Sequence, residues 1–223
     1  MAQSEMNATQ STDENEAIVP NHMIIILDKY IGNAEEYALL LSSFCMTMDP
    51  TTGLFERNLN KDDIDQSICF NTALLVQLDD VQFMFQAFTD IEKCYNTIEQ
   101  NQHKRIFFIT SGSLGKIIVP SLVKLYPETF PSDNPIFIFC ANLLREKVGD
   151  TSPTNLWLLE FLENVLPFDH EDDLLARMTR EIANYFAAEA QRLVNSQQHD
   201  KARQYQDWST RMLHRHEALM KKK

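Results

Sequence analysis

The sequence predicts an α/β protein with a doubly wound, mostly parallel sheet of five strands and a C-terminal helical extension. Between residues 21 and 168, short apolar runs alternate with amphipathic helical patterns. Residues 104–126 form the clearest unit, in which an apolar run is followed by Gly112, Gly115 and an amphipathic stretch. This is the strand–turn–helix unit from which parallel sheets are built. From residue 172 onward the apolar spacing is purely helical.

Each expected strand is a bounded apolar run, a pattern typical of strands covered on both faces. Five runs qualify, and the last predicts an edge strand: residues 23–27, 81–88, 105–110, 135–140 and 164–168.

Helices are expected where apolar residues recur at spacings of three and four. Residues 62–78 fit a helix better than a strand, although residues 70–76 alone are also compatible with an extended chain. We expect a loop over residues 143–152 and helices over residues 34–48, 62–78, 90–100, 115–126 and 154–163. The predicted organisation is a disordered lead (1–20), an α/β domain (21–168) and a helical extension (169–223).

Composition narrows the class of protein. With 44% hydrophobic residues the 223-residue chain has enough apolar side chains for a core. No apolar run approaches the roughly 20 residues that a membrane-spanning helix needs. The net charge of −12 argues against broad nucleic-acid binding. Residues 201–223 carry seven bases and two acids, typical of a solvated chain end, with contact to an acidic partner or to RNA as the alternative.

Four cysteines, Cys45, Cys69, Cys94 and Cys140, sit beside apolar neighbours, and none forms a CxxC pair. This spacing favours buried, reduced thiols over a zinc site or a disulfide framework. We therefore expect a cytoplasmic protein without a metal or other cofactor.

The segments FTDIEKC, IFFITSGSLGKIIVPSL and PIFIFCAN, within residues 88–142, resemble a receiver-like domain of animal multidomain proteins. That domain precedes tetratricopeptide-type helices or ADP-ribosyltransferase modules. The resemblance covers about residues 22–168 and implies the flavodoxin-like plan shared by response-regulator receivers and TIR domains. It also implies a signalling-adaptor setting.

The chain departs from both families at their functional positions. Receivers have a phosphoacceptor aspartate where this chain has Thr110 and Ser111, and Asp28 lacks the paired acid, being preceded by Leu27. TIR-type NAD hydrolases have a glutamate about a dozen residues after the equivalent serine, whereas residues 112–127 contain no acid. Phosphotransfer and NAD cleavage by those routes are therefore disfavoured.

One small-ligand site can still be predicted, at the switch point between the first and third strands of such a sheet. Its residues are Asp28, Ser111, Gly112, Ser113 and Gly115. Glycines at a helix start allow backbone N–H groups to approach a phosphate. The true P-loop pattern is not met, and a tight turn with Ser111 or Ser113 as helix cap explains the same residues.

Two acidic runs are better explained by structure than by chemistry. Residues 170–173 (HEDD) fit a helix start better than a metal cluster, and residues 79–80 fit a loop better than a catalytic pair.

Two helical stripes end the chain. The stripe from Leu174 to Leu193 is expected to dock on the sheet. A second stripe suits either a partner or internal packing: Tyr205, Trp208, Met212 and Leu219. The favoured function is a non-enzymatic protein-interaction or signalling-adaptor module that binds a protein partner or itself. The alternative is a nucleotide- or phosphate-binding sensor or degenerate enzyme using the edge formed by Asp28 and residues 111–113.

Overall fold

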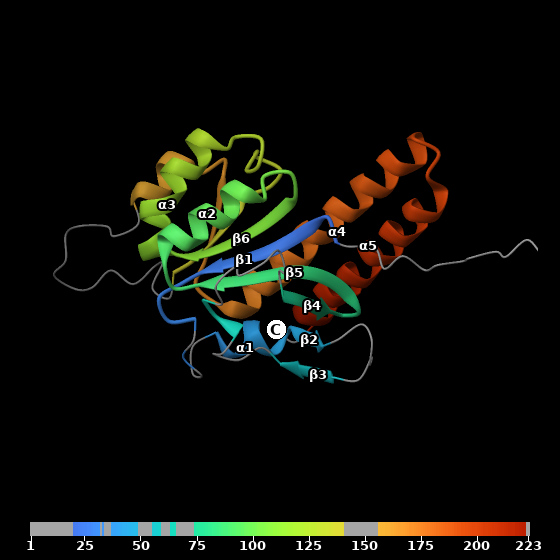
Figure 1. The fold of residues 1–223 in the computed structure, drawn as a ribbon, viewed down its shortest axis with the longest axis horizontal. Helices are drawn as coiled ribbons and strands as arrows, with labels where there is room; N and C mark the ends of the chain where they lie inside the picture. The colour runs from blue at the N-terminus through green and yellow to red at the C-terminus, as the bar shows by residue number, and fades with distance from the viewer. Residues whose placement is uncertain are drawn as a thin grey trace, which may run out of the picture.

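The computed structural model describes residues 20–31, 33, 37–48, 55–58, 63–65, 74–140 and 156–221. Its fold is α/β: helices cover both faces of one mixed sheet, and two long helices end the chain (Figure 1). The strands are β1 (His22–Leu27), β2 (Cys45–Met48), β3 (Phe55–Asn58), β4 (Leu74–Leu78), β5 (Val81–Phe88), β6 (Arg105–Ser111), β7 (Ile136–Phe139) and β8 (Val165–Phe168). The helices are α1 (Ala38–Ser42), α2 (Ile91–Gln100), α3 (Gly112–Leu125), the 3₁₀ helix η2 (Leu156–Phe161), α4 (Glu171–Asn195) and α5 (His199–Met220).

The sheet has eight strands in the order β3-β2-β4-β5-β1-β6-β7-β8. All neighbours from β5 to β8 run parallel, whereas β3, β2 and β4 are joined antiparallel at the β5 side. The predicted α/β class and mostly parallel sheet are confirmed, but the predicted count of five strands is wrong. Of the three additional strands, β2 and β4 lie where helices were expected, and β3 lies between those two ranges.

Two helix predictions in that part fail because strand pairing overrides the local apolar spacing. In place of a helix over 34–48, α1 ends at Ser42 and Cys45–Met48 pairs with both β3 and β4. In place of a helix over 62–78, Leu74–Leu78 pairs with β5. Asp79 and Asp80, both with positive φ (47° and 61°), form the hairpin turn between β4 and β5, in accordance with the predicted loop.

Buried apolar runs explain the central strands. Every residue of β1 is buried, and its side chains alternate between two cores. Ile24 and Ile26 face the core under α1, α4 and α5, whereas Met23 and Ile25 face the core under α2, α3 and η2. Because helices cover both faces of the sheet, β1 has no alternation of apolar and polar residues.

Two later helices also differ from expectation. Gly112 begins α3, so the predicted turn is the first turn of this helix. The helix expected over 154–163 is the shorter 3₁₀ helix η2. Residues 1–19, the expected loop at 143–152 and Cys69 lie outside the described residues.

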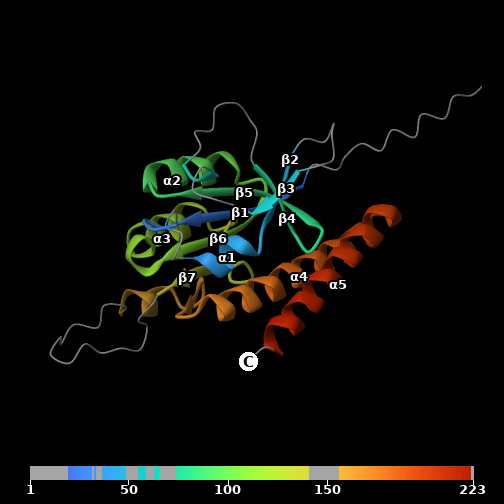
Figure 2. The ribbon, with the colours of Figure 1, turned by 90° about the horizontal axis from the view of Figure 1, so that it is seen from below.

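The C-terminal helices lie side by side and extend beyond the sheet (Figures 1 and 2). The predicted α4 stripe is confirmed, since Leu174, Met178, Ile182, Phe186 and Leu193 are buried in the same core as the strands. Residues 170–173 (HEDD) mark the start of α4. The three acids lie in the first turn of the helix, where the positive end of the helix dipole stabilises their negative charge.

Candidate functional site

The carboxyl edge of the parallel strands brings Asp28 and Ser111 to neighbouring positions. β1 and β6 are parallel neighbours in which Leu27 pairs with Thr110, and the two candidate residues come next on each strand. Both are buried. The switch-point argument therefore predicts their placement correctly.

Internal contacts occupy part of this edge. The Asp28 Oδ1 accepts a hydrogen bond from the Tyr30 backbone N–H at 2.6 Å. The Ser111 and Ser113 hydroxyls lie 3.3 Å apart, and Ser111 is the N-cap residue of α3, although its side chain makes no capping hydrogen bond. The Gly112 backbone N–H bonds to the thiol of Cys140, whose pKa burial raises to about 11, the hydrogen bond acting against that rise. One of the N–H groups predicted to face a phosphate is thus already paired.

Packing explains the glycine at position 115, and its predicted part in a ligand site stays untested. A Cβ at this position would lie 3.1 Å from Thr110 Cγ2 and 3.3 Å from both Ile138 Cδ1 and Trp157 Cη2. The missing side chain therefore lets α3 pack closely on β6, β7 and η2.

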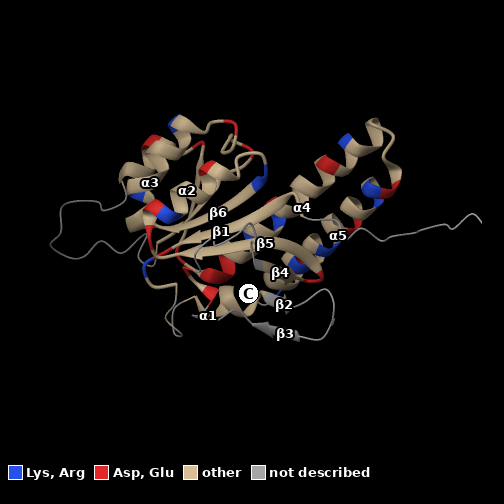
Figure 3. Ribbon diagram, viewed as in Figure 1, with Lys and Arg blue, Asp and Glu red and all other residues tan. Residues whose placement is uncertain are grey.

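Asp65 is a residue of this edge that the sequence did not single out. Its carboxylate accepts hydrogen bonds from the Thr89 backbone N–H (3.0 Å) and the Thr89 hydroxyl at the carboxyl end of β5. Asp65 has positive φ (52°), which aspartate tolerates better than most residues. Acidic residues gather around these strand ends (Figure 3). In the part of the chain that the structure describes, however, no three metal-ligating side chains come together.

A groove of about 580 Å³ separates the first turns of α2 and α3 beside this edge. Its apolar lining includes Ile91, Tyr95, Leu114 and Ile117, and Lys29 and Glu92 also line it. Ile117 is 60% exposed.

On the other side of α3, η2 and the residue that follows it expose Leu156, Leu159 and Leu162, each between 54% and 61%. A 3₁₀ helix has three residues per turn, so side chains three apart lie in one row. The spacing of these leucines is visible in the sequence, but only the structure shows that the row faces solvent. We call the row of these three leucines the apolar face.

The second C-terminal stripe is covered by the chain itself. Tyr205, Met212 and Leu219 are buried, and the partly buried Trp208 packs against the same core. Ser209 Oγ donates to the α4 carbonyl of Ala183 at 2.9 Å. The structure therefore contains the internal packing that the sequence left open as one alternative. Binding of a partner by these residues stays untested.

Basic residues along α5 (Figure 3) form ion pairs with the β4–β5 turn. Arg211 Nη1 lies 3.1 Å from Asp80 Oδ2, and Arg215 Nη1 lies 3.6 Å from Asp79 Oδ1.

His22 is a fully buried histidine at the start of β1. Its Nε2 donates to the Gln82 carbonyl at 2.8 Å, whereas Nδ1 is buried without a hydrogen-bond partner. The rings of Phe83, Phe186 and Trp208 lie between 4.9 and 5.6 Å from the imidazole. Burial lowers the pKa of His22 to about 4, against a smaller opposite effect of the Gln82 hydrogen bond.

The buried thiols predicted from the cysteine spacing are confirmed for Cys94 and Cys140. Burial raises the pKa of Cys94 well above its usual range, as expected of an unreactive thiol. Within the described residues, no helix combines the length and the apolar character needed to cross a membrane.

Comparison with protein-family models, curated proteins and solved structures finds no match for this chain. The resemblance to receiver-like and TIR-like domains therefore stays a prediction.

Proposed function

We propose that this chain is a non-enzymatic protein-binding module of the signalling-adaptor type, and that its partner contacts the apolar face. The observation that carries the proposal is the row formed by Leu156, Leu159 and Leu162. Large apolar side chains gathered on one surface are typical of interaction sites rather than of inert surface. Burying such a side chain in an interface contributes about 1.5–3 kcal/mol.

The parallel part of the sheet supports the flavodoxin-like plan expected from the resemblance. Numbered along their own order in the chain, strands β1, β5, β6, β7 and β8 lie in the order 2-1-3-4-5. In this plan α2, α3 and η2 form one outer layer. They cover the core on one face of the sheet, and α4 and α5 cover the core on the other face. The apolar face lies on that layer.

The predicted ligand residues of the carboxyl edge form no catalytic pair with one another. Asp28 accepts a backbone hydrogen bond, Ser111 and Ser113 contact each other, and Gly112 is paired with Cys140. General acid–base or nucleophilic chemistry needs a base within hydrogen-bond reach of the group that it activates. Asp28, Ser111 and Ser113 have no such relationship with one another, whereas the Asp65 carboxylate accepts from the Thr89 hydroxyl at the same edge.

The test is comparative capture of binding proteins by the intact chain, its Leu159→Asp variant and a Leu213→Asp control. Leu213 is 42% exposed on α5 and lies outside the apolar face. A charge in the centre of an apolar interface should weaken binding by at least about tenfold. We expect Leu159→Asp to lose partners that the control retains. Equal capture by all three folded proteins would contradict the proposal, and a mass that rises with concentration would identify a second copy as the partner.

A second candidate function, a nucleotide- or phosphate-binding sensor, is favoured by the adjacency of Asp28 and Ser111. Its test is a thermal-shift series with phosphate, nucleotides, NAD and ADP-ribose. A ligand at a hundredfold excess over its dissociation constant stabilises the fold by about 2.7 kcal/mol. The shift should disappear in Ser113→Asp and Gly112→Val. A shift that both variants retain would place the ligand elsewhere.

A further inference from the structure

Another hollow among the described residues lies on the α4–α5 side of the sheet, away from the apolar face. It has a volume of about 320 Å³, at the lower end of the range for small-ligand sites. β8 and the loop after it contribute Phe168 and Asp169, α4 contributes Asp173, Arg177 and Arg180, and the end of α5 contributes His216 and Met220. Apolar surface, two acids and three basic side chains thus meet in one small space.

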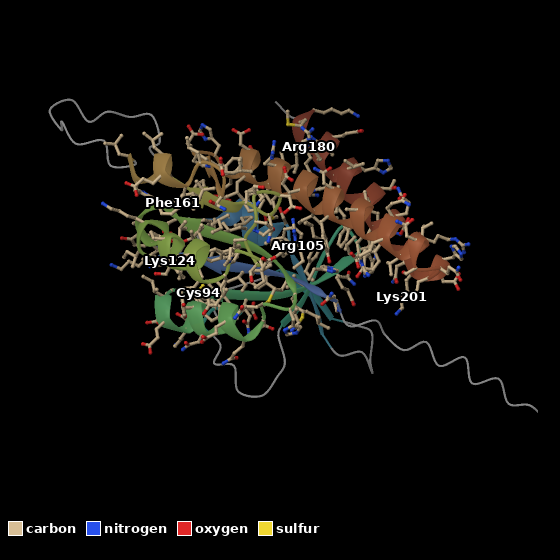
Figure 4. The ribbon with its side chains drawn as sticks, turned by 90° about the horizontal axis from the view of Figure 1, so that it is seen from above. Cys94, Arg105, Lys124, Phe161, Arg180 and Lys201 are labelled. Atoms are coloured by element: carbon tan, nitrogen blue, oxygen red, sulfur yellow. The ribbon has the colours of Figure 1, made fainter. Side chains whose placement is uncertain are left out.

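Arg180 supplies an unused positive charge to this hollow. Arg177 is paired with Glu181, with Nε and Oε1 2.7 Å apart. Arg180 makes no ion pair with another residue of the described part of the chain. Figure 4 places it on α4, near the carboxyl end of α5. A guanidinium with free N–H groups matches a carboxylate in two-point geometry.

His216 has a fixed orientation in the same hollow. Its Nδ1 lies 2.7 Å from the backbone carbonyl oxygen of Ala176. A carbonyl only accepts, so Nδ1 carries the hydrogen and the neutral ring keeps Nε2 as an acceptor. Asp169 lines the hollow with a second acceptor group.

A simple ion suits this combination poorly. Asp169 repels an anion such as phosphate, and the two arginines repel a simple cation. A ligand with both charges satisfies each group. From the juxtaposition of Arg180, His216 and Asp169 beside Phe168 and Met220, we infer that this hollow binds a small zwitterion of the amino-acid or dipeptide class with an apolar side chain.

The contacts follow from the chemistry of such a ligand. Its carboxylate pairs with Arg180, and its ammonium group donates to Asp169 and to His216 Nε2. Its apolar side chain lies against Phe168 and Met220. The inference is independent of the proposed protein-binding function, because the two surfaces cover opposite faces of the sheet.

Calorimetric titration with charge-blocked analogues tests the inference on the full chain. The probes are leucine and glycyl-leucine, which separate the amino-acid from the dipeptide class, together with N-acetylleucine and leucine amide. We expect saturable binding of at least one zwitterion at millimolar concentration, and binding at least about tenfold weaker for each blocked analogue. N-acetylleucine lacks the cation, and leucine amide lacks the anion.

Variants assign the contacts. Arg180→Gln should weaken zwitterion binding at least about tenfold without affecting the residual affinity for leucine amide, and Asp169→Asn should behave in the same way towards N-acetylleucine. Arg203→Gln, at an exposed position on α5 outside the hollow, should bind like the unmodified protein. Absence of saturable binding to both zwitterions would overturn the inference. So would equal affinity for a blocked analogue, or affinity that Arg180→Gln leaves unchanged.

Discussion

Protonation of His22 should destabilise the fold in mildly acidic solution. The imidazole is enclosed by aromatic rings and by the Gln82 carbonyl, and its pKa of about 4 compares with an ordinary value of 6.5. Because the unfolded chain binds the proton more tightly, the stability contributed by neutral His22 is complete above about pH 6.5 and is lost as the pH falls towards 4. The difference of about 2.5 pKa units sets a limit of about 3.4 kcal/mol, of which about 2 kcal/mol is lost by pH 5.

The measurement is chemical denaturation from about pH 7.5 to about pH 5, where the linkage effect develops. Carboxylates also titrate near this range, so the relevant quantity is the difference in unfolding free energy between the unmodified chain and His22→Gln. That difference should shrink by about 2 kcal/mol on acidification. His103→Gln, at an exposed turn position, should give a curve parallel to that of the unmodified chain.

A pH-independent difference between the unmodified chain and His22→Gln would refute the reasoning. If the variant does not fold, an NMR titration of the His22 ring in the unmodified chain decides the question. Titration near pH 6.5 would then show that the site does not exclude the charged form.

Three further predictions follow from packing and from the β4–β5 turn. Gly115→Val should lower the unfolding free energy by about 1–3 kcal/mol, because its methyl groups meet three packed side chains; an unchanged value in denaturation would show spare room. Met212→Ala should lower the unfolding free energy by about 2–5 kcal/mol and leave the molecular mass in solution unchanged, whereas Leu213→Ala, at the half-exposed neighbouring position, should lower it by about 0.5 kcal/mol. Equal losses of unfolding free energy would place Met212 outside the core. Asp79→Asn combined with Asp80→Gly should not lower the melting temperature, since Asn-Gly suits a turn with two positive φ values and exposed ion pairs contribute little. The contrary result would be a lower melting temperature in the double variant, together with a similar decrease when high salt is added to the unmodified chain. That result would show that the ion pairs hold α5.

Local sequence was sufficient for the central strands, which are covered on both faces, and for the amphipathic helix α4. The central strands β1, β6 and β7 are continuous apolar runs, and α4 has one unbroken apolar stripe. A continuous apolar run fits a strand covered on both faces, and an unbroken apolar stripe fits an amphipathic helix, so these patterns predicted the α/β class. For β2 and β4 the same reasoning failed, because the strand state of Cys45–Met48 and Leu74–Leu78 depends on pairing with distant residues.

Only those features of the candidate site that follow from the order and direction of the strands were predictable from the sequence. Parallel pairing of β1 with β6 brings Asp28 beside Ser111, as the switch-point rule requires. The role of Gly115 was not predictable, since it depends on Ile138 and Trp157, which are distant in sequence. His22 escaped notice for a similar reason: the aromatic rings around it come from β5, α4 and α5.

Site-specific photo-crosslinking tests the central claim, that the apolar face binds a protein partner, most directly. A photoreactive amino acid replaces Leu159 in one protein and Leu213 in a second, and both are illuminated in a cell extract. We predict a discrete crosslinked species of higher mass from position 159 and none from position 213. Crosslinks of equal yield from both positions, or none from position 159, would contradict the claim.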